Sequence, residues 1–182
     1  MSPGFDAITV VGVSGSPAAA SRSRTLLEGA LGALERYGIR ARQIDLAGLP
    51  ADALLARRHD PAVADALAAV LAARIVVVST PTYRATYSGL LKVFFDLLPP
   101  DALAGKVAVA IATGATPAHF LAVDHGLRPL LASVGAVVAP TSVYGVDAQF
   151  RDGAPDILLR EHVDRAVAEA AALAGLVPAL EA

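Results

Sequence analysis

Three short segments of this sequence consist almost entirely of valine, isoleucine and alanine, and they constrain the fold more than any other feature. The segments are AITVVGVS (7–14), RIVVVST (74–80) and KVAVAIAT (106–113). A strand covered on one face alternates apolar and polar residues, whereas a strand covered on both faces does not have to alternate. The three segments therefore predict neighbouring strands inside a parallel sheet that has helices on both sides.

Two further strands and the helices complete the pattern. IRARQIDL (39–46) places apolar residues at Ile39, Ala41 and Ile44, which is typical of an edge strand, and AVVAPTSVY (136–144) predicts a fifth strand. Apolar residues at helical spacing, bounded by Gly, Pro and Ser signals, predict the helices. These helices are expected over residues 23–37, 61–73, 88–98, 117–134 and 156–175.

The strict alternation of strand and helix predicts the architecture. It indicates an α/β protein of the flavodoxin-like class, a three-layer doubly wound fold with a five-stranded parallel sheet in the order 2-1-3-4-5. The length of 182 residues fits one domain over residues 1–182. Ligands of such folds bind at the carboxyl ends of the strands. Residues 145–156 are expected to form a surface loop before the last helix.

Composition excludes several classes of function. The chain has no cysteine, so disulfides, thiol nucleophiles and iron–sulfur ligation are excluded, and redox chemistry would need a bound cofactor. The net charge of −2 argues against nucleic acid as a partner. The absence of a signal-peptide pattern and of a long apolar run leads us to expect a cytoplasmic protein without membrane association. The histidines His59, His119 and His162 lack zinc-ligand spacing, so no metal site is expected.

The segment after the first strand, SGSPAAASRSRTLL (14–27), predicts a phosphate site. Gly15 permits a sharp turn, and the following helix presents free N–H groups. It lacks both G-x-x-x-x-G-K-[ST] and G-x-G-x-x-G, so a terminal monophosphate fits better than a triphosphate or a bridging pyrophosphate. The alternative is an ordinary strand-to-helix turn with serine caps. The side chains available to an anion are those of Ser16, Ser21, Ser23, Arg22 and Arg24.

The segments after the third and fourth strands predict a site for a planar ligand. In STPTYRATYSGLLK (79–92), Pro81 stiffens a turn between Tyr83 and Tyr87, which suits a flat aromatic molecule. In ATGATPAHF (112–120), the donors available to the polar edge of a heterocycle come from Thr113, Gly114 and Thr116. The alternative in both cases is a capped helix start with surface tyrosines nearby.

Taken together, these segments resemble the NADPH-dependent FMN reductase family, and within it the branch that serves sulfonate monooxygenases. The resemblance spans residues 8–146, and its middle stretch is its most specific part. The matching segments are GSP…SRS-x-x-LL (15–27), TPTYRATYSGLLK…DLLP (80–99), ALAGKV (102–107), ATG (112–114) and AHFLAVDHGLRPLL (118–131).

The resemblance implies an NAD(P)H:FMN oxidoreductase that transfers hydride from NADPH or NADH to FMN. It also implies a homo-oligomer, a tetramer or dimer, that supplies reduced flavin to a partner monooxygenase cleaving a carbon–sulfur bond. By position, the phosphate would be held by Ser16, Ser21, Arg22 and Ser23. The flavin ring would be lined by Pro81, Thr82, Tyr83 and Arg84, with Thr113, Gly114 and Ala115 opposite.

Two residues depart from the family pattern. Ala115 stands where the family has a second glycine, so local geometry near the ring must differ if that position needs a positive φ. His125 stands where the alkanesulfonate branch has a tyrosine that widens a helical turn near a subunit interface and the flavin. One hypothesis is that His125 contacts the flavin or a neighbouring subunit, as a possible catalytic residue. The other is a solvated or interface histidine with no catalytic role.

Hydride transfer between stacked rings depends on positioning, so no conventional catalytic acid or base is expected. Three alternatives stay open. The first is a quinone, azo-dye or chromate reductase with tightly bound FMN. The second is a non-enzymatic flavin carrier, against which the small net charge argues. The third is a Rossmann-type dehydrogenase that uses Asp45, although its glycine fingerprint is missing. The preference between NADH and NADPH is also open.

Overall fold

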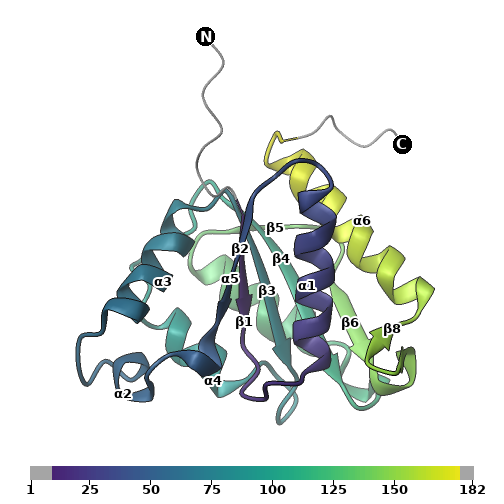
Figure 1. The fold of residues 1–182 in the computed structure, drawn as a ribbon, viewed down its shortest axis with the longest axis horizontal. Coiled ribbons are helices and arrows are strands. Elements are labelled where there is room, and N and C mark those ends of the chain that lie inside the picture. The colour runs from purple at the N-terminus through teal and green to yellow at the C-terminus, as the bar shows by residue number, and fades with distance from the viewer. Residues whose placement is uncertain (1–9, 177–182) are drawn as a thin grey trace.

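The central strands of the sheet have the predicted order. The computed structural model describes residues 10–176 (Figure 1). Four parallel strands lie side by side in the order β2-β1-β3-β4, and β5 continues this order beyond β4. The four are β1 (Val10–Ser14), β2 (Ala41–Asp45), β3 (Ile75–Pro81) and β4 (Val107–Gly114). The predicted flavodoxin-like α/β class with the order 2-1-3-4-5 is thereby confirmed.

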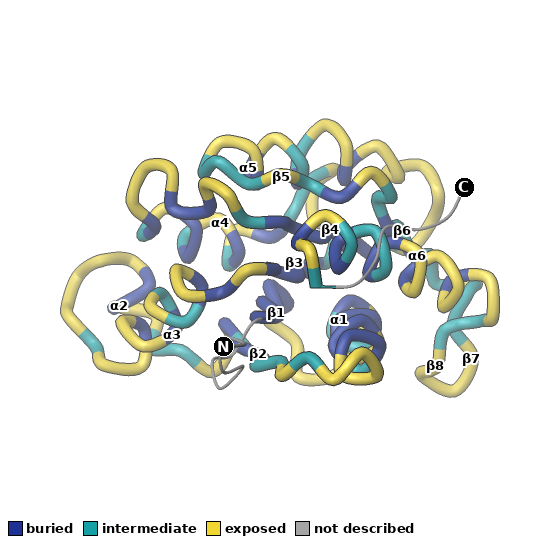
Figure 2. The backbone as a smooth tube through the Cα atoms, turned by 90° about the horizontal axis from the view of Figure 1, so that it is seen from above, coloured by how far each residue is buried: buried dark blue, intermediate teal, exposed yellow. Residues whose placement is uncertain are grey.

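Burial follows the hydrophobic pattern of the strands. Every residue of β1 is buried, and so are all residues of β3 and β4 except the last of each, whereas β2 buries only Ile44. Figure 2 shows these central strands in dark blue between helices whose outer sides are exposed. The prediction of β2 as an edge strand is confirmed, because its outer side has no hydrogen-bonded neighbour in the described sheet.

One continuous fifth strand was predicted over 136–144, and this prediction is wrong because the segment forms two strands. It consists of β5 (Val137–Val138) and β6 (Val143–Val146), which both pair with β4. Pro140 has no N–H and cannot donate to the sheet, and the N–H of Thr141 donates instead to Glu169, at 2.8 Å. The chain therefore leaves the sheet briefly and returns beside the carboxyl half of β4.

Helices cover both faces of the sheet. One face packs against α1 (Arg22–Glu35) and α6 (Ile157–Leu173), and the other face packs against the remaining long helices. Those are α3 (Pro61–Ala72), α4 (Gly89–Phe95) and α5 (Arg128–Ser133). The leucines of α1 are central to its face, and burying each one stabilises the fold by about 1.5–3 kcal/mol. They are Leu26, Leu27, Leu31 and Leu34.

Two short elements after β2 lie outside the sequence-based predictions. They are the 3-10 turn Leu46–Gly48 and the short helix α2 (Ala51–Leu54). Asp45 accepts a hydrogen bond from the N–H of Ala47 at 3.2 Å, which starts the turn. Within the described residues no helix is long and apolar enough to cross a membrane.

The single helix predicted over 117–134 is also wrong. The segment contains the 3-10 turn Pro117–His119, the π-helical turn Val123–Leu127 and only then α5. Pro129 lacks an N–H, so an unbroken ladder of α-helical hydrogen bonds cannot run through this segment. The π-helical turn includes His125, so the wide helical turn that the resemblance places at this position is present.

Residues 145–156 were expected to be a surface loop and are partly a hairpin. The strands β7 (Phe150–Arg151) and β8 (Ala154–Pro155) pair antiparallel. Asp152 and Gly153 join them with φ values of 50° and 80°, which is the backbone that a tight hairpin turn requires. The hairpin lies beside the amino end of α1 at the carboxyl edge of the sheet (Figure 1).

Candidate functional site

The three segments selected from the sequence meet at one cavity. In Figure 1 they gather along the lower edge, where β1, β3 and β4 end. The cavity has a volume of about 1070 Å³, which is large enough for a nucleotide-sized ligand. The segments after these strands contribute Ser16, Ser21, Arg22, Pro81, Thr82, Tyr83, Thr113, Gly114 and Ala115 to its lining.

The segment after β1 is held against β3 and α4 by backbone and serine hydrogen bonds. The N–H of Gly15 donates to the carbonyl of Ser79 at 2.8 Å, and the hydroxyl of Ser88 donates to the carbonyl of Gly15 at 2.5 Å. A Cβ atom at Gly15 would lie 2.9 Å from the Cβ of Leu91. Glycine is therefore required here for the close approach of α4, rather than for the sharp turn that the sequence indicated.

The amino end of α1 has no side-chain cap. Ser21 has the extended backbone of a capping residue, yet its side chain accepts no hydrogen bond from a backbone N–H of the first turn. Its hydroxyl instead shares a hydrogen bond with that of Ser23, at 2.8 Å. The first N–H groups of a helix need partners and attract negative charge. The first N–H groups of α1 therefore lie uncapped beside the cavity, where Ser21 and Arg22 are part of the lining.

The segment after β3 forms the opposite side of the cavity. The N–H of Thr82 donates to the carbonyl of Thr113 at 2.7 Å and joins the ends of β3 and β4. The hydroxyl oxygen of Thr82 is buried and has no hydrogen-bond partner among the described residues. A buried polar atom of this kind is uncommon, and here it lies on a residue that lines the cavity.

A tight turn follows Thr82. Tyr83 and Thr86 exchange backbone hydrogen bonds, and Arg84 and Ala85 between them have φ values of 51° and 67°. Residues other than glycine seldom adopt this backbone, and such strain is often found at functional sites. The turn leaves Tyr83 with 48% of its surface exposed at the edge of the cavity.

The segment after β4 has no left-handed backbone at Ala115, so alanine fits there without strain. The glycine before it has a different role. A Cβ atom on Gly114 would lie 2.0 Å from the hydroxyl of Tyr144. Tyr144 donates a hydrogen bond to the carbonyl of Thr116 at 3.2 Å. Gly114 therefore makes room for the tyrosine that ties this segment to β6.

Both arginines that line the cavity are ion-paired. Arg22 lies 2.9 Å from Asp147 and its guanidinium is 5.9 Å from the centre of the Phe150 ring. Arg24 lies 2.6 Å from Asp45 and also 3.1 Å from Glu28. The positive charge at the mouth of the cavity is therefore largely balanced by carboxylates.

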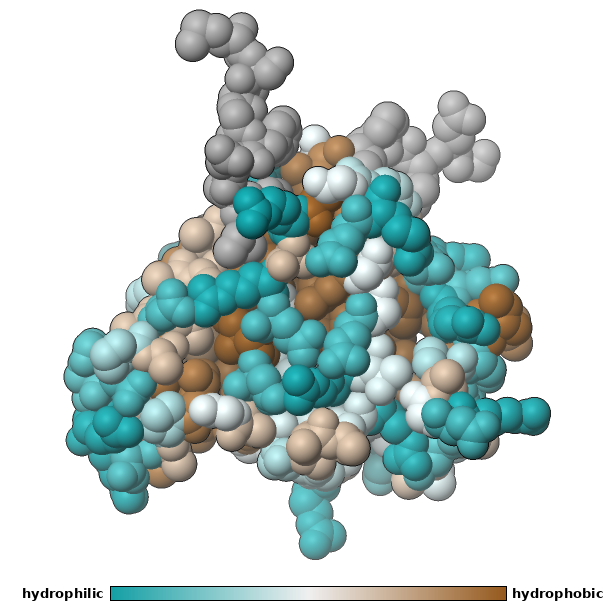
Figure 3. Space-filling model, in the orientation of Figure 1, coloured by the Kyte–Doolittle hydropathy of each residue, from teal (hydrophilic) through white to brown (hydrophobic). Residues whose placement is uncertain are grey.

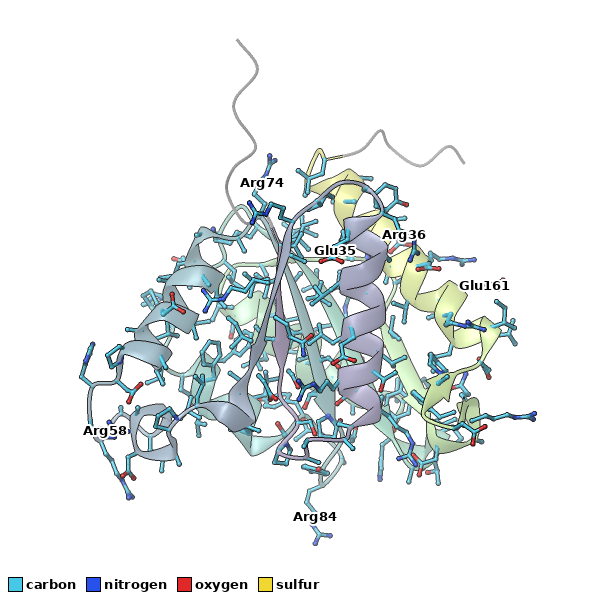
Figure 4. All side chains as sticks on the ribbon, in the orientation of Figure 1. Glu35, Arg36, Arg58, Arg74, Arg84 and Glu161 are labelled. Atoms are coloured by element: carbon cyan, nitrogen blue, oxygen red, sulfur yellow. The ribbon has the colours of Figure 1, made fainter. Side chains whose placement is uncertain are left out.

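Five predicted residues lie outside the lining of this cavity, and they are Ser23, Arg84, Tyr87, Thr116 and His125. Ser23 lies on the buried face of α1, with Leu26 and Leu27 three and four positions further along the same helix face. Arg84 extends from the lower edge away from the molecule in Figure 4, and Figure 3 shows a hydrophilic projection at that place. His125 lines a separate cavity of about 270 Å³, together with Thr86 and Gly126 among others.

The sequence-based predictions missed one wall of the cavity. It is formed by the segment after β6 and its hairpin, which contribute Asp147, Phe150, Asp152 and Gly153. Glu28, in the second turn of α1, was also missed. No local motif marks these residues, because β6 and the hairpin reach the cavity only through the pairing of β6 with β4.

The cavity fits a molecule with a phosphate at one end and a planar group at the other. The uncapped donors of α1 and the Ser21 hydroxyl match a phosphate monoester, while the segment of Pro81, Thr82 and Tyr83 matches a planar ring. FMN has this shape and chemistry. In the part of the chain that the structure describes, no cluster of side chains could hold a metal ion.

Comparison with known proteins agrees with this fit. The family model described as NADPH-dependent FMN reductase matches residues 8–151. A protein of Pseudomonas putida named FMN reductase (NADPH) is 40% identical over 141 residues, which cover 77% of this chain and 72% of the relative. A protein of Pseudomonas fluorescens named NADH-dependent FMN reductase SfnF is 37% identical over 149 residues, 80% of each chain.

A solved structure gives the same result in three dimensions. The apo form of an NADH:FMN oxidoreductase, EMOB, superimposes with a TM-score of 0.81 at 39% sequence identity. The match covers 87% of this chain and 85% of the other. Since the family model covers well over half of the sequence and the relatives match most of it, the chain belongs to the NADPH-dependent FMN reductase family.

Proposed function

We propose that this chain oxidises NADH or NADPH, reduces FMN and releases the reduced flavin to a flavin-dependent monooxygenase of organosulfur metabolism. The observation that carries the proposal is the uncapped amino end of α1, which opens onto a cavity of nucleotide size. Family membership supports the oxidoreductase activity with FMN and a reduced nicotinamide coenzyme.

The cavity residues divide into two groups in this proposal. The phosphate would accept hydrogen bonds from the first N–H groups of α1 and from the Ser21 hydroxyl, with Arg22 as the charged partner. Pro81, Thr82 and Tyr83 would contact one side of the ring and the 113–115 segment the other. When bound, FMN supplies the ring nitrogen that accepts hydride from nicotinamide.

The chain itself contributes positioning and a polar environment. The hydrogen bond from Thr82 to Thr113 fixes the two ring-binding segments relative to each other. Two serine hydroxyls hold the proposed phosphate segment against β3 and α4. Ser79, in β3, donates to the carbonyl of Ser23 at 2.5 Å, and Ser88, which precedes α4, donates to the carbonyl of Gly15. Holding two reactants in a productive geometry supplies much of a rate enhancement.

The finer parts of the proposal rest on resemblance. The names of the relatives include both NADPH-dependent and NADH-dependent FMN reductases, so either coenzyme is compatible with the family. A homo-oligomer, a cytoplasmic location and a sulfonate-cleaving partner are proposed on the same ground. A role for His125 at a subunit interface is proposed with them, because His125 lies in the π-helical turn, outside the main cavity.

Coenzyme oxidation by freshly purified protein under air tests the proposal. We expect NADPH and NADH oxidation to depend strictly on added FMN. Protein that purifies yellow and reduces a quinone without added FMN would contradict the release of flavin and support a tightly bound prosthetic group. Protein that binds FMN but oxidises neither coenzyme with any acceptor would be a flavin carrier, and the enzymatic proposal would be overturned.

A further inference from the structure

We infer that Asp147 competes with the phosphate of FMN for Arg22, and that this competition keeps the flavin exchangeable. The inference rests on the proposed function, because it assigns a role in that same site to a residue outside the predicted set. Asp147 would act as an affinity-setting residue through Arg22.

The ion pair lies directly at the phosphate end of the cavity. Arg22 is the first residue of α1, so its side chain leaves the helix beside the free N–H groups. Its Nη1 atom is 2.9 Å from Oδ1 of Asp147, and the two side chains keep 49% and 43% of their surface exposed. The guanidinium also lies 5.9 Å from the centre of the Phe150 ring. Arg22 is thus held on the far wall of the cavity by two residues of one segment.

Asp147 is fixed by the sheet. It follows β6, whose last residue, Val146, is in register with Gly114 of β4. The N–H of Val146 donates to the side-chain oxygen of Gln149 at 3.0 Å and closes the turn that contains Asp147. The backbone that carries the carboxylate is therefore held beside the cavity by a paired strand and a closed turn.

The ion pair between Arg22 and Asp147 is weak enough for a phosphate to displace the carboxylate. A half-exposed ion pair contributes about 0–1 kcal/mol, because water screens both charges. A phosphate monoester carries a charge of about −1.5 to −2 near neutral pH, whereas a carboxylate carries a single negative charge, so the phosphate attracts Arg22 more strongly. The phosphate therefore replaces Asp147 as the partner of Arg22. Asp147 then remains close to a dianion, and the repulsion lowers the affinity for FMN.

The other charges of the cavity offer no substitute. Arg24 is the second arginine of the lining, and Asp45 and Glu28 hold it. Asp152 adds a further carboxylate to the lining. Among the described residues that line the cavity, Arg22 and Arg24 are the cationic side chains, so a phosphate that enters this site shares or takes a cation that a carboxylate already holds.

The decisive variant is Asp147→Asn, which keeps the size of the side chain and removes its charge. Titration with FMN and with riboflavin at low ionic strength, followed by flavin fluorescence, measures both affinities without turnover. We expect FMN to bind about threefold to tenfold more tightly to the variant, which corresponds to the removal of one nearby like charge. Riboflavin affinity should not change, because riboflavin has no phosphate. The FMN effect should shrink as salt is added.

Two further variants distinguish an effect of the Arg22–Asp147 pair on FMN affinity from an effect of the total negative charge of the cavity. Asp152→Asn removes the same charge from the same wall, and we expect a smaller effect on FMN affinity. In an Arg22→Gln background, Asp147→Asn should then have no larger effect than Asp152→Asn. Equal gains from the two single variants would overturn the inference, because a general field would explain them.

The outcomes also separate this inference from the proposed function. If the unaltered protein binds FMN and supports coenzyme oxidation, but Asp147→Asn binds FMN equally or more weakly, only the inference is wrong. In that case Asp147 positions Arg22 for the phosphate instead of competing with it. If the unaltered protein binds neither FMN nor riboflavin, the proposed function and the inference are both overturned.

Discussion

The helices α1 and α4 begin at the same edge of the sheet, and each is preceded by a serine in extended conformation. Ser88 accepts a hydrogen bond from the N–H of Leu91 at 3.1 Å, donates to Gly15 and is almost completely buried. Ser21 makes no such cap and faces the cavity. Ser88 therefore caps α4 and binds the Gly15 segment, whereas the first N–H groups of α1 have no side-chain cap.

This difference shows how a ligand site can be distinguished from a capped helix. Serine at a helix start is common to both, so residue type does not separate them. α3, α4 and α6 are each capped by the side chain before their first residue. The helix that lacks this cap despite having the serine is the one at the cavity.

The largest effect is expected from Gly15→Val, which forces the two helix starts apart. A Cβ atom at this position already meets Leu91 at 2.9 Å and the Ser79 carbonyl at 3.3 Å. We expect the free energy of unfolding to fall by about 1–3 kcal/mol through overpacking. FMN affinity should fall by more than about tenfold, since the loss of a charge-assisted phosphate contact has that size. Urea unfolding and FMN titration measure the two effects.

Gly29→Ala is the matched control for this variant. It lies in α1, and a Cβ atom there meets nothing within 4 Å. We expect it to stabilise the protein by about 0.5–1 kcal/mol through helix propensity, with FMN affinity unchanged. If both glycine variants lowered FMN affinity alike, the close approach of Gly15 to α4 would not explain the effect.

The next effect concerns the closed helix start. Ser88→Ala removes the cap of α4 and the hydrogen bond to the Gly15 carbonyl in a buried position. We expect a loss of about 1–2 kcal/mol in the free energy of unfolding. Chemical denaturation checks this value. If the free energy of unfolding did not change within experimental error, the Ser88 cap would not stabilise α4. The proposed difference between the starts of α4 and α1 would then be wrong.

The corresponding change at the open helix start should affect stability less. Ser21→Ala removes a hydroxyl that caps no N–H group but pairs with the buried Ser23 hydroxyl at 2.8 Å, so the free energy of unfolding should fall by about 0.5–1 kcal/mol. FMN affinity should fall about tenfold, as expected for one hydrogen bond to a charged phosphate, while riboflavin affinity stays the same. A stability loss as large as that of Ser88→Ala would show that Ser21 is a cap in solution.

The smallest effect is expected from Arg84→Ala. Arg84 was predicted to line the flavin ring, but it is not part of the cavity lining, and its side chain extends away from the molecule (Figure 4). Removing a solvent-exposed charge at this distance should change FMN affinity by less than about twofold. FMN titration of the isolated variant checks this. A large loss of affinity would return Arg84 to the ring-binding group.

Much of the site was accessible from the sequence because ligand contacts in this fold come from strand-to-helix segments. Ser16, Ser21 and Arg22 lie at the cavity as expected. Ser23 was predicted among the phosphate ligands, although its spacing to Leu26 and Leu27 already places it on the buried face of α1. The helical period was the better guide at this position.

The missed features depend on contacts between distant segments. Asp147 and Phe150 reach Arg22 because β6 pairs with the end of β4. The break between β5 and β6 has a local sign in Pro140, but where the chain rejoins the sheet does not. The π-helical turn around His125 packs against β4 and leads directly into α5.

The sequence by itself determined the strand order, the helices around the sheet and the edge at which a ligand binds. It could do so because burial on two faces leaves a nearly continuous apolar pattern, and because parallel strands end at a common edge. Only the tertiary structure decided which helix start stays uncapped and which carboxylate holds Arg22. Both depend on hydrogen bonds and charges between residues that are far apart in the chain, and no local pattern records those distances.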